Sequence, residues 1–217
     1  MPLSAKIYLS TVISGGMALV VLSISQLAPV EPMQFAVFLI LGLLGSGMKV
    51  RLPGVSASMS ISFLPILMSA VLLSAAESVV VAAAAAVAQC YLRAQKRPSL
   101  VHLAFNVSSL AISARIASAV SQEISAGLVA VILAAAAYYL MNATLLCAVI
   151  ATTQSKAFTS VWDRTYWLSL PYYASGAALV FVAINAGGHA SGLVVLPVML
   201  LAYKYYAQWM GRPEQAA

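Results

Sequence analysis

The sequence predicts an all-α protein, a polytopic bundle of about eight transmembrane helices, and three observations support this fold class. Apolar residues make up 63% of the 217 residues and charged residues only 7%, with a mean hydropathy of +0.98. A soluble domain carries about 25% charged residues on its hydrated surface. The apolar runs are long and continuous, unlike the alternating segments of about ten residues in a transmembrane β-barrel. Most basic residues lie beside these runs, as in loops that flank membrane helices.

Polar breaks separate the expected crossings. The first crossing is longer than the apolar core of a signal peptide, about 7–15 residues, so we expect it to remain as a helix. The second and third are close to the lower limit of about 17 residues for a spanning helix, so six or seven helices are also possible. The breaks are, in order, "PVEP", "KVRLPG", "SAAES", "RAQKRPS", "SQEISAG", "TTQSKAFTSVWDR" and "NAGGH". The eight windows cover residues 7–28, 33–49, 58–75, 77–94, 100–120, 126–152, 165–186 and 190–210.

The distribution of charge predicts the topology. If the N-terminus is cytoplasmic and the crossings number eight, ten of the eleven basic residues fall on the cytoplasmic side, as the positive-inside rule requires. The acidic residues Glu31, Glu77 and Glu123 then fall on the opposite side. We therefore expect both termini in the cytoplasm and a single integral membrane domain over residues 1–217.

The chain offers no constellation for catalysis or metal binding. Its two histidines and five acidic residues form no Ser–His–Asp set, carboxylate pair or metal cluster, and Cys90 and Cys147 form no CxxC motif. We therefore expect a non-enzymatic protein without a metal or cofactor. The net charge of +6 is explained by topology signals, so we expect no nucleic-acid partner.

A polar segment, "GVSASMSIS" at residues 54–62, interrupts the apolar sequence after Pro53. We expect an ordinary helix that begins near Ser56, whose serines make small contacts for close helix packing. In the alternative reading the segment is partly extended and presents alternate hydroxyls to a polar cavity. Both readings turn it toward protein, because lipid-facing extended backbone would leave amides without partners.

Polar residues also form a stripe along the fifth expected crossing, residues 100–120. They occupy positions i, i+4, i+7 and i+11 from His102 to Ser113. A polar stripe on a membrane helix faces the bundle interior or a cavity. One reading is interhelical hydrogen bonding that fixes the packing, and the other is a small-molecule pocket. A pH switch at His102 is conceivable, but we expect a satisfied interfacial histidine. The candidate binding or interior polar residues are Ser58, Ser62, Gln89, His102, Asn106, Ser109 and Asn142.

Two further sets carry structural predictions. Arg115 is the one basic residue off the topology pattern; it either snorkels to the membrane surface or forms an ion pair with Glu77 or Glu123. Gly42 and Ser46, four positions apart, predict a small-residue face for close helix packing.

Several motifs between residues 42 and 113 are shared with a known family. They are "KVRLPG" followed by alternating small hydroxyl residues and S-F, a glutamate at the start of the next helix, "AQC" at 88–90, a basic loop ending in R-P, and "FN" at 105–106. With these motifs the chain resembles the multi-pass, MASE-like membrane sensor region that precedes HD-GYP or GGDEF output domains in bacterial signalling proteins. The closing "LPVMLLAYKYYAQWMGRPEQ" is similar to the last helix that leads to the output module.

The resemblance implies a sensor-like or ligand-binding module of the bacterial inner membrane, here without the output domain. It would pass a signal, within cyclic-dinucleotide signalling, to other membrane or cytoplasmic signalling subunits. Its other expected partners are membrane lipids and a small-molecule ligand. Two alternatives stay open: a transport component similar to a small substrate-binding subunit, and a structural subunit of a larger membrane complex.

Overall fold

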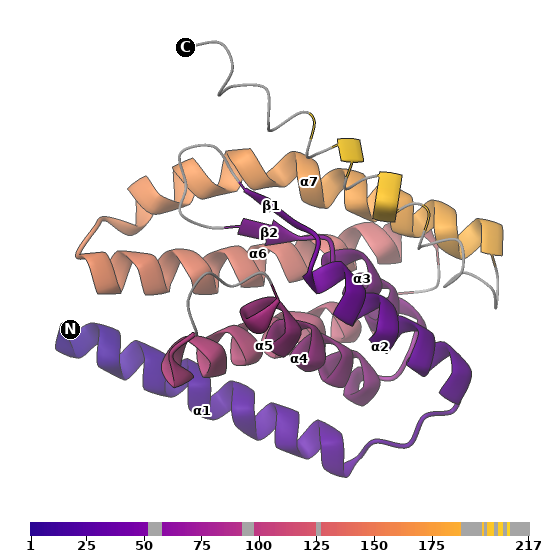
Figure 1. Ribbon diagram of the computed structural model, residues 1–217, viewed down its shortest axis with the longest axis horizontal. Coiled ribbons are helices and arrows are strands. Elements are labelled where there is room, and N and C mark those ends of the chain that lie inside the picture. Colours follow the sequence, from indigo (N-terminus) through magenta and orange to yellow (C-terminus); the bar gives the residue numbers. More distant parts are fainter. Residues whose placement is uncertain are drawn as a thin grey trace.

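The computed structural model describes residues 1–51, 58–92, 98–124 and 127–187, with residues 197, 199–201, 204, 205 and 208 of the C-terminal segment. The described part is helical apart from one short ribbon of two strands, so the expected helical class is confirmed (Figure 1). Most of the expected crossing at 190–210 lies outside the described residues. The elements are α1 (Leu3–Ser25), α2 (Pro32–Ser46), β1 (Lys49–Arg51), β2 (Ser58–Ser60), α3 (Phe63–Leu72), α4 (Ala75–Tyr91), α5 (Leu100–Glu123), α6 (Leu128–Gln154) and α7 (Phe158–Gly187).

The helices differ in their ability to span a bilayer. Four segments are long and apolar enough to cross one, by length and composition: Leu3–Ser25, Leu100–Glu123, Leu128–Gln154 and Ser169–Ala186. The helices α2, α3 and α4 are apolar but shorter. With 10 residues, α3 extends about 15 Å, half of the hydrocarbon thickness of about 30 Å. It cannot cross the membrane as a helix alone.

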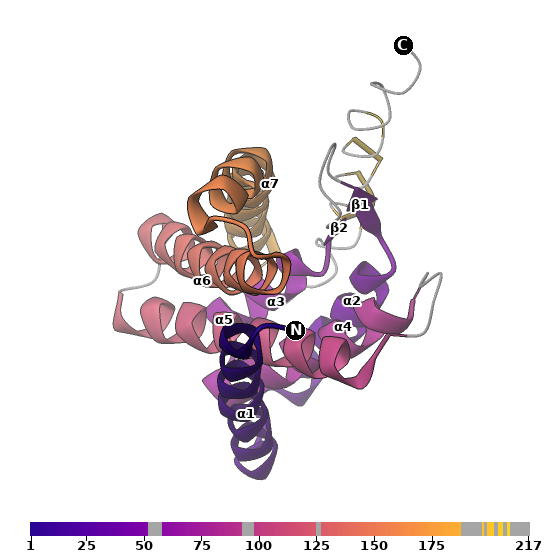
Figure 2. The same cartoon turned by 90° about the vertical axis from the view of Figure 1, so that its left-hand side faces the viewer.

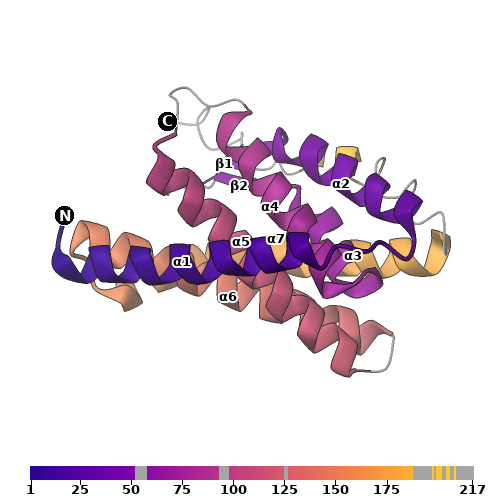
Figure 3. The same ribbon diagram turned by 90° about the horizontal axis from the view of Figure 1, so that it is seen from below.

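The helices run between two ends of the bundle. The N-terminus and the α6–α7 connection lie at one end, and the α1–α2 connection lies at the other (Figures 1 and 3). Figure 2 views the bundle from the end that is on the left in Figure 1, and shows α5 between α1 and α6, with α7 outside α6. The packing agrees, because α5 contacts α1, α4 and α6 extensively.

The polar segment before α3 is where the structure differs from the sequence prediction. The expected helix from Ser56 is wrong at residues 58–60, which form strand β2. This strand pairs antiparallel with β1, with Lys49 opposite Ser60, and the amide of Ile61 continues the ladder to the carbonyl of Met48 at 3.2 Å. The extended reading is therefore correct for residues 58–60, and β1 supplies the partners that their backbone needs.

Pro65 explains why the helix starts no earlier than Phe63. A proline has no amide hydrogen, and in a helix interior its ring clashes with the carbonyl four positions earlier. A helix running from Ser56 would place that clash at Ile61. When α3 begins at Phe63, Pro65 lies in the first turn, where the missing amide bond costs nothing.

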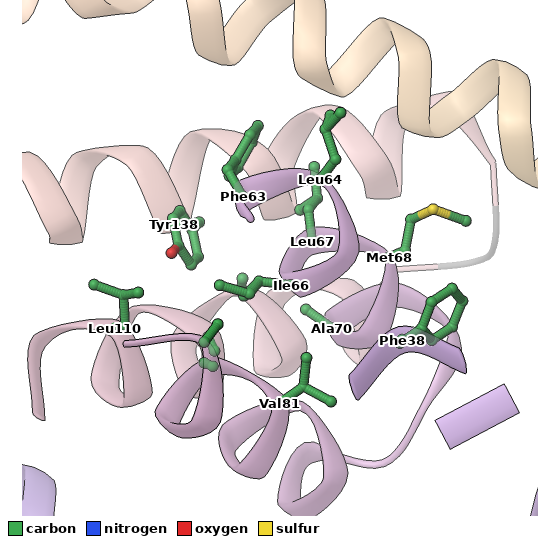
Figure 4. Close-up of a cluster of buried hydrophobic side chains, with 14 of the residues drawn as sticks. Phe38, Phe63, Leu64, Ile66, Leu67, Met68, Ala70, Val81, Leu110 and Tyr138 are labelled. Atoms are coloured by element: carbon green, nitrogen blue, oxygen red, sulfur yellow. The ribbon is translucent and has the colours of Figure 1, made fainter. Parts of the chain in front are cut away.

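The helix α3 forms the centre of the hydrophobic core. Every residue from Ser60 to Ala70 is buried, as expected for a helix that is apolar on all sides. Side chains from four surrounding helices lie around it in Figure 4: Phe38 from α2, Val81 from α4, Leu110 from α5 and Tyr138 from α6. The ten-residue helix is thus enclosed by its neighbours.

Candidate functional site

The joint between β2 and α3 is held by hydrogen bonds from two directions. The hydroxyl of Ser60 donates to the carbonyl of Gly45 in α2 at 2.9 Å. Its oxygen lies 2.9 Å from the hydroxyl of Ser62. The backbone carbonyl of Ser60 accepts a 2.7 Å hydrogen bond from the phenol of Tyr172 in α7. The joint therefore ties α2 and α7 to the start of α3.

An aromatic cluster surrounds Phe63, the first residue of α3. Its ring centroid lies 4.5 Å from that of Tyr173 in an edge-on arrangement, 5.3 Å from Tyr138 and 6.0 Å from Tyr172. These rings come from α6 and α7. Gly176 makes the approach of α7 possible, because a Cβ built there would lie 2.7 Å from the Phe63 ring. The start of α3 is therefore packed tightly against both helices.

Asn142 links three helices through hydrogen bonds beside this cluster. Its amide nitrogen donates to the hydroxyl of Tyr173 at 3.1 Å, and its amide oxygen accepts from the hydroxyl of Ser109 at 3.4 Å. The donor Ser109 belongs to α5, Asn142 to α6 and Tyr173 to α7. This Asn142 bridge is one of the polar connections between α7 and the middle of the bundle.

Asn106 is engaged on a different side of α5. Its amide nitrogen lies 3.4 Å from both the carbonyl of Ala86 and the sulfur of Cys90, which belong to α4. The stripe predicted on α5 is therefore divided, with Asn106 toward α4 and Ser109 toward α6. Both contacts are hydrogen bonds between helices.

The other candidate binding residues are dispersed. Gln89 is half-buried on α4, and His102 is exposed in the first turn of α5, where its backbone amide is capped by Ser99. Ser62 is buried and bonded to Ser60, and the side chain of Ser58 lies outside the described residues. The structure thus brings together Ser109 and Asn142 but separates them from Asn106 and from the Ser60–Ser62 pair.

The residues considered for an ion pair also lie apart. Arg115 is exposed on α5, and Glu123 is exposed at the end of that helix. Glu77 is buried at the start of α4 and forms a capping box with Ser74. In the part of the chain that the structure describes, Arg115 forms no ion pair with either glutamate. The same part contains no group of three His, Cys, Asp or Glu side chains arranged to hold a metal.

Gly42 and Ser46 lie buried at the contact between α2 and α4. The hydroxyl of Ser46 donates to the carbonyl of Ala85 at 2.8 Å. A Cβ on Gly42 would meet Val81 at 3.5 Å, which is ordinary van der Waals contact. Among the described glycines, the tightest approach is one that sequence reasoning missed: a Cβ on Gly16 would overlap with the Cβ of Ser108.

A pattern on α1 points to the close approach at Gly16: the buried positions of this helix form a stripe. This stripe recurs every three or four residues at Ala5, Leu9, Val12, Gly16, Val20 and Ser23. Half of its members are small, which is typical of a helix face that packs closely against another membrane helix. Gly15 lies off this stripe and has open space around it.

Comparison with known proteins places most of the chain in one family. A family model described as MASE9 matches residues 8–204, and this is a family of membrane-associated sensory domains. No curated protein matches the chain, and no solved structure matches it.

Proposed function

The chain belongs to the MASE9 family of membrane-associated sensory domains, and from this membership we propose that it is a non-catalytic, multi-pass sensor module of a bacterial inner membrane. The match over residues 8–204 confirms the predicted MASE-like resemblance and is the observation that carries the proposal. In this proposal the module passes a signal to a cytoplasmic partner in a cyclic-dinucleotide pathway. Residues 1–217 then act as one integral membrane domain.

The packing around α3 supports a signalling role. A ligand or membrane condition changes a protein's conformation only when it favours one of two arrangements. The interior polar contacts between helices include single hydrogen bonds, such as the Asn142 bridge and the bond from Tyr172 to Ser60. A bond of this kind in a membrane bundle contributes about 0.6 kcal/mol on average. Two packings that differ by a few such bonds lie within reach of a stimulus.

In this proposal α7 is the element that moves. It contacts α6 and α3, and it is tied to α5 and α6 through Asn142 and to β2 through Tyr172. Met199, beyond the end of α7, is fully buried. Its methyl group lies 2.7 Å from the position that a Cβ of Gly45 would take. A shift of α7 would therefore reach the C-terminal segment through the same joint.

A chimera tests the proposal without knowledge of the natural stimulus. The full chain is joined at its C-terminal end to a diguanylate cyclase domain, and the cyclic dinucleotide level is measured in cells. The variants Asn142→Leu and Tyr173→Phe remove the Asn142 bridge. We expect each to change the level about threefold, the population shift that corresponds to roughly 0.6 kcal/mol.

The matched control is Thr144→Val. Thr144 is exposed on α6 and donates to the carbonyl of Leu140 in its own helix, so its loss leaves the interior contacts intact. Equal cyclase output from the parent chimera and both interior variants, at equal membrane levels, would contradict the sensor proposal. Loss of solute uptake in the same variants would favour a transport component instead.

A further inference from the structure

A buried carboxyl group at the start of α4 has one oxygen without a partner. Glu77 is 2% exposed. Its Oε2 accepts hydrogen bonds from the amide of Ser74 at 2.9 Å and from the Ser74 hydroxyl at 2.6 Å. Its Oε1 has no hydrogen-bonding partner among the described residues, and neither does the fully buried hydroxyl of Ser78, the next residue in the chain. The helix cap therefore explains the hydrogen bonds of Oε2 but leaves the buried Oε1 without a partner.

The elements packed against α4 bring no cation to Glu77. Helices α2 and α3 contain no charged residue. Asn106 contacts the last turn of α4, so α5 runs antiparallel to α4 and His102 lies at the opposite end from Glu77. Arg115 and Glu123, in the half of α5 nearer Glu77, are exposed, and Arg115 makes no ion pair with Glu77 in the described part of the chain.

The charged end of α1 is also remote from Glu77. Leu9 and Val12 pack with Phe105 in one hydrophobic cluster, and Gly16 lies against Ser108. Helix α1 therefore runs parallel to α5, so its first turns, with Lys6 and Tyr8, lie toward the end of α4 that is far from Glu77. Burying a carboxylate without a compensating charge or hydrogen bond is strongly unfavourable. The positive N-terminal end of α4 offsets part of the charge on Glu77, and the described residues of these helices supply no side-chain cation for its free oxygen.

The neighbouring end of α3 has the polarity to favour a cation. Helix α3 ends at Leu72, and the capping amide of Leu73 bonds to the carbonyl of Ser69. The last carbonyls of a helix lack partners inside the helix, and its C-terminal end carries about −0.5 elementary charge. Broken helices in membrane proteins use such ends to coordinate Na⁺ or H⁺. Only Leu73 and Ser74 separate the end of α3 from the start of α4.

We propose that the free Oε1 of Glu77, beside the connection between α3 and α4, binds Na⁺. The site does not depend on the sensor function proposed above. It lies at the end of the bundle that holds the α1–α2 connection, because α2 and α4 run parallel: Gly42 lies against Val81, and Ser46 bonds to Ala85.

The test is the thermal unfolding of the full chain in lipid nanodiscs. The series replaces choline chloride by NaCl at constant ionic strength. We expect the midpoint to rise by about 2–4 °C with sodium, because a cation that binds only the folded state stabilises it.

Two variants separate cation binding from helix capping. Glu77→Gln keeps a capping-box side chain, since glutamine serves at this position as well as glutamate, and we expect it to fold but to lose the response. Glu123→Gln, at the exposed end of α5, is the matched control and should keep the response. A parent chain that does not respond to sodium, or a Glu77→Gln variant that responds fully, would overturn the proposal and leave Glu77 as a cap alone.

Discussion

The phenol of Tyr172 donates a 2.7 Å hydrogen bond to the backbone carbonyl of Ser60, 112 positions earlier in the chain. Both residues are buried. The bond joins the middle of α7 to the last residue of β2, and therefore to the point where the chain changes from strand to the central helix α3. It makes the position of α7 depend on the position of α3.

Removing this phenol should loosen the joint. We expect Tyr172→Phe to lower the free energy of unfolding by about 0.6–1.7 kcal/mol, the range for interhelical hydrogen bonds in membrane proteins, since the aromatic ring stays in place. The measurement is unfolding of the purified protein in mixed micelles. Tyr91→Phe, at an exposed position on α4, is the control. Equal stability of the two variants would contradict a structural role for the bond.

The two adjacent glycines of α1 should respond oppositely to enlargement. A Cβ on Gly16 would lie 2.5 Å from the backbone Cα of Ser108, whereas Gly15 has nothing within 4 Å. We expect Gly16→Ala to destabilise the protein by about 1–3 kcal/mol through overpacking. Gly15→Ala should be neutral or stabilise the helix by up to about 1 kcal/mol. Thermal unfolding in detergent compares the pair, and similar midpoints would contradict a close α1–α5 crossing.

A second glycine pair tests which positions of α2 are tight. A Cβ on Gly45 would lie 3.0 Å from the backbone nitrogen of Ser62, while one on Gly42 would make ordinary contact with Val81. Gly45→Ala should therefore cost about 1–3 kcal/mol, and Gly42→Ala should be tolerated. Unfolding midpoints of the two variants measure the difference. A larger loss at Gly42 would mean that α2 packs on α4 more closely than on the start of α3.

The Asn142 bridge predicts energetic coupling between α6 and α7. A double-mutant cycle with Asn142→Ala and Tyr173→Phe should give an interaction energy of about 0.5 kcal/mol or more, since residues in direct contact are not additive. The same cycle with Asn106→Ala and Tyr173→Phe is the control and should be additive, because Asn106 bonds to α4. Additivity in both cycles would remove the support for a bridge.

Cysteine labelling tests the proposed topology. Lys156 lies in the α6–α7 connection and Glu31 in the α1–α2 connection, at opposite ends of the bundle (Figure 3). In intact cells, a membrane-impermeant maleimide should label Glu31→Cys but not Lys156→Cys until the membrane is opened. The native Cys90 and Cys147 are buried and serve as the background. The reverse labelling pattern would invert the proposed orientation.

The sequence predicted the helical class and five helices close to their observed bounds, because long apolar runs separated by polar breaks leave few other folds for a membrane chain. Helix α7 was also expected, but it begins at Phe158, inside a segment expected to be a connection. The third crossing was the exception. The alternating serines favoured an extended segment before α3, but an ordinary helix was expected; Pro65 was a further signal in the sequence that this expectation did not use. The pairing of β2 with β1 depends on a contact between two segments that polar residues separate, and no local pattern displays it.

The interior polar residues were recognisable, but their grouping was not. The spacing of Asn106 and Ser109 on α5 predicts one face, yet the two side chains contact α4 and α6 respectively. Positions three apart on a helix are separated by about 60° of rotation, enough for two neighbouring helices to divide a face between them. Which neighbour each residue meets depends on crossing angles that a single sequence does not contain.

The enclosure of α3 has a consequence for biogenesis. A ten-residue apolar helix is too short to leave the translocon and rest in lipid by itself, given the roughly 17 residues that spanning requires. We therefore expect α3 to enter the bilayer together with α4 as a hairpin. Strand β2, which precedes α3, extends the first arm of that hairpin. Until α5, α6 and α7 have been synthesised and close around it, the strand-to-helix joint is held only by its earlier neighbours α2 and β1. Assembly of this protein is thus expected to finish only when its later helices arrive.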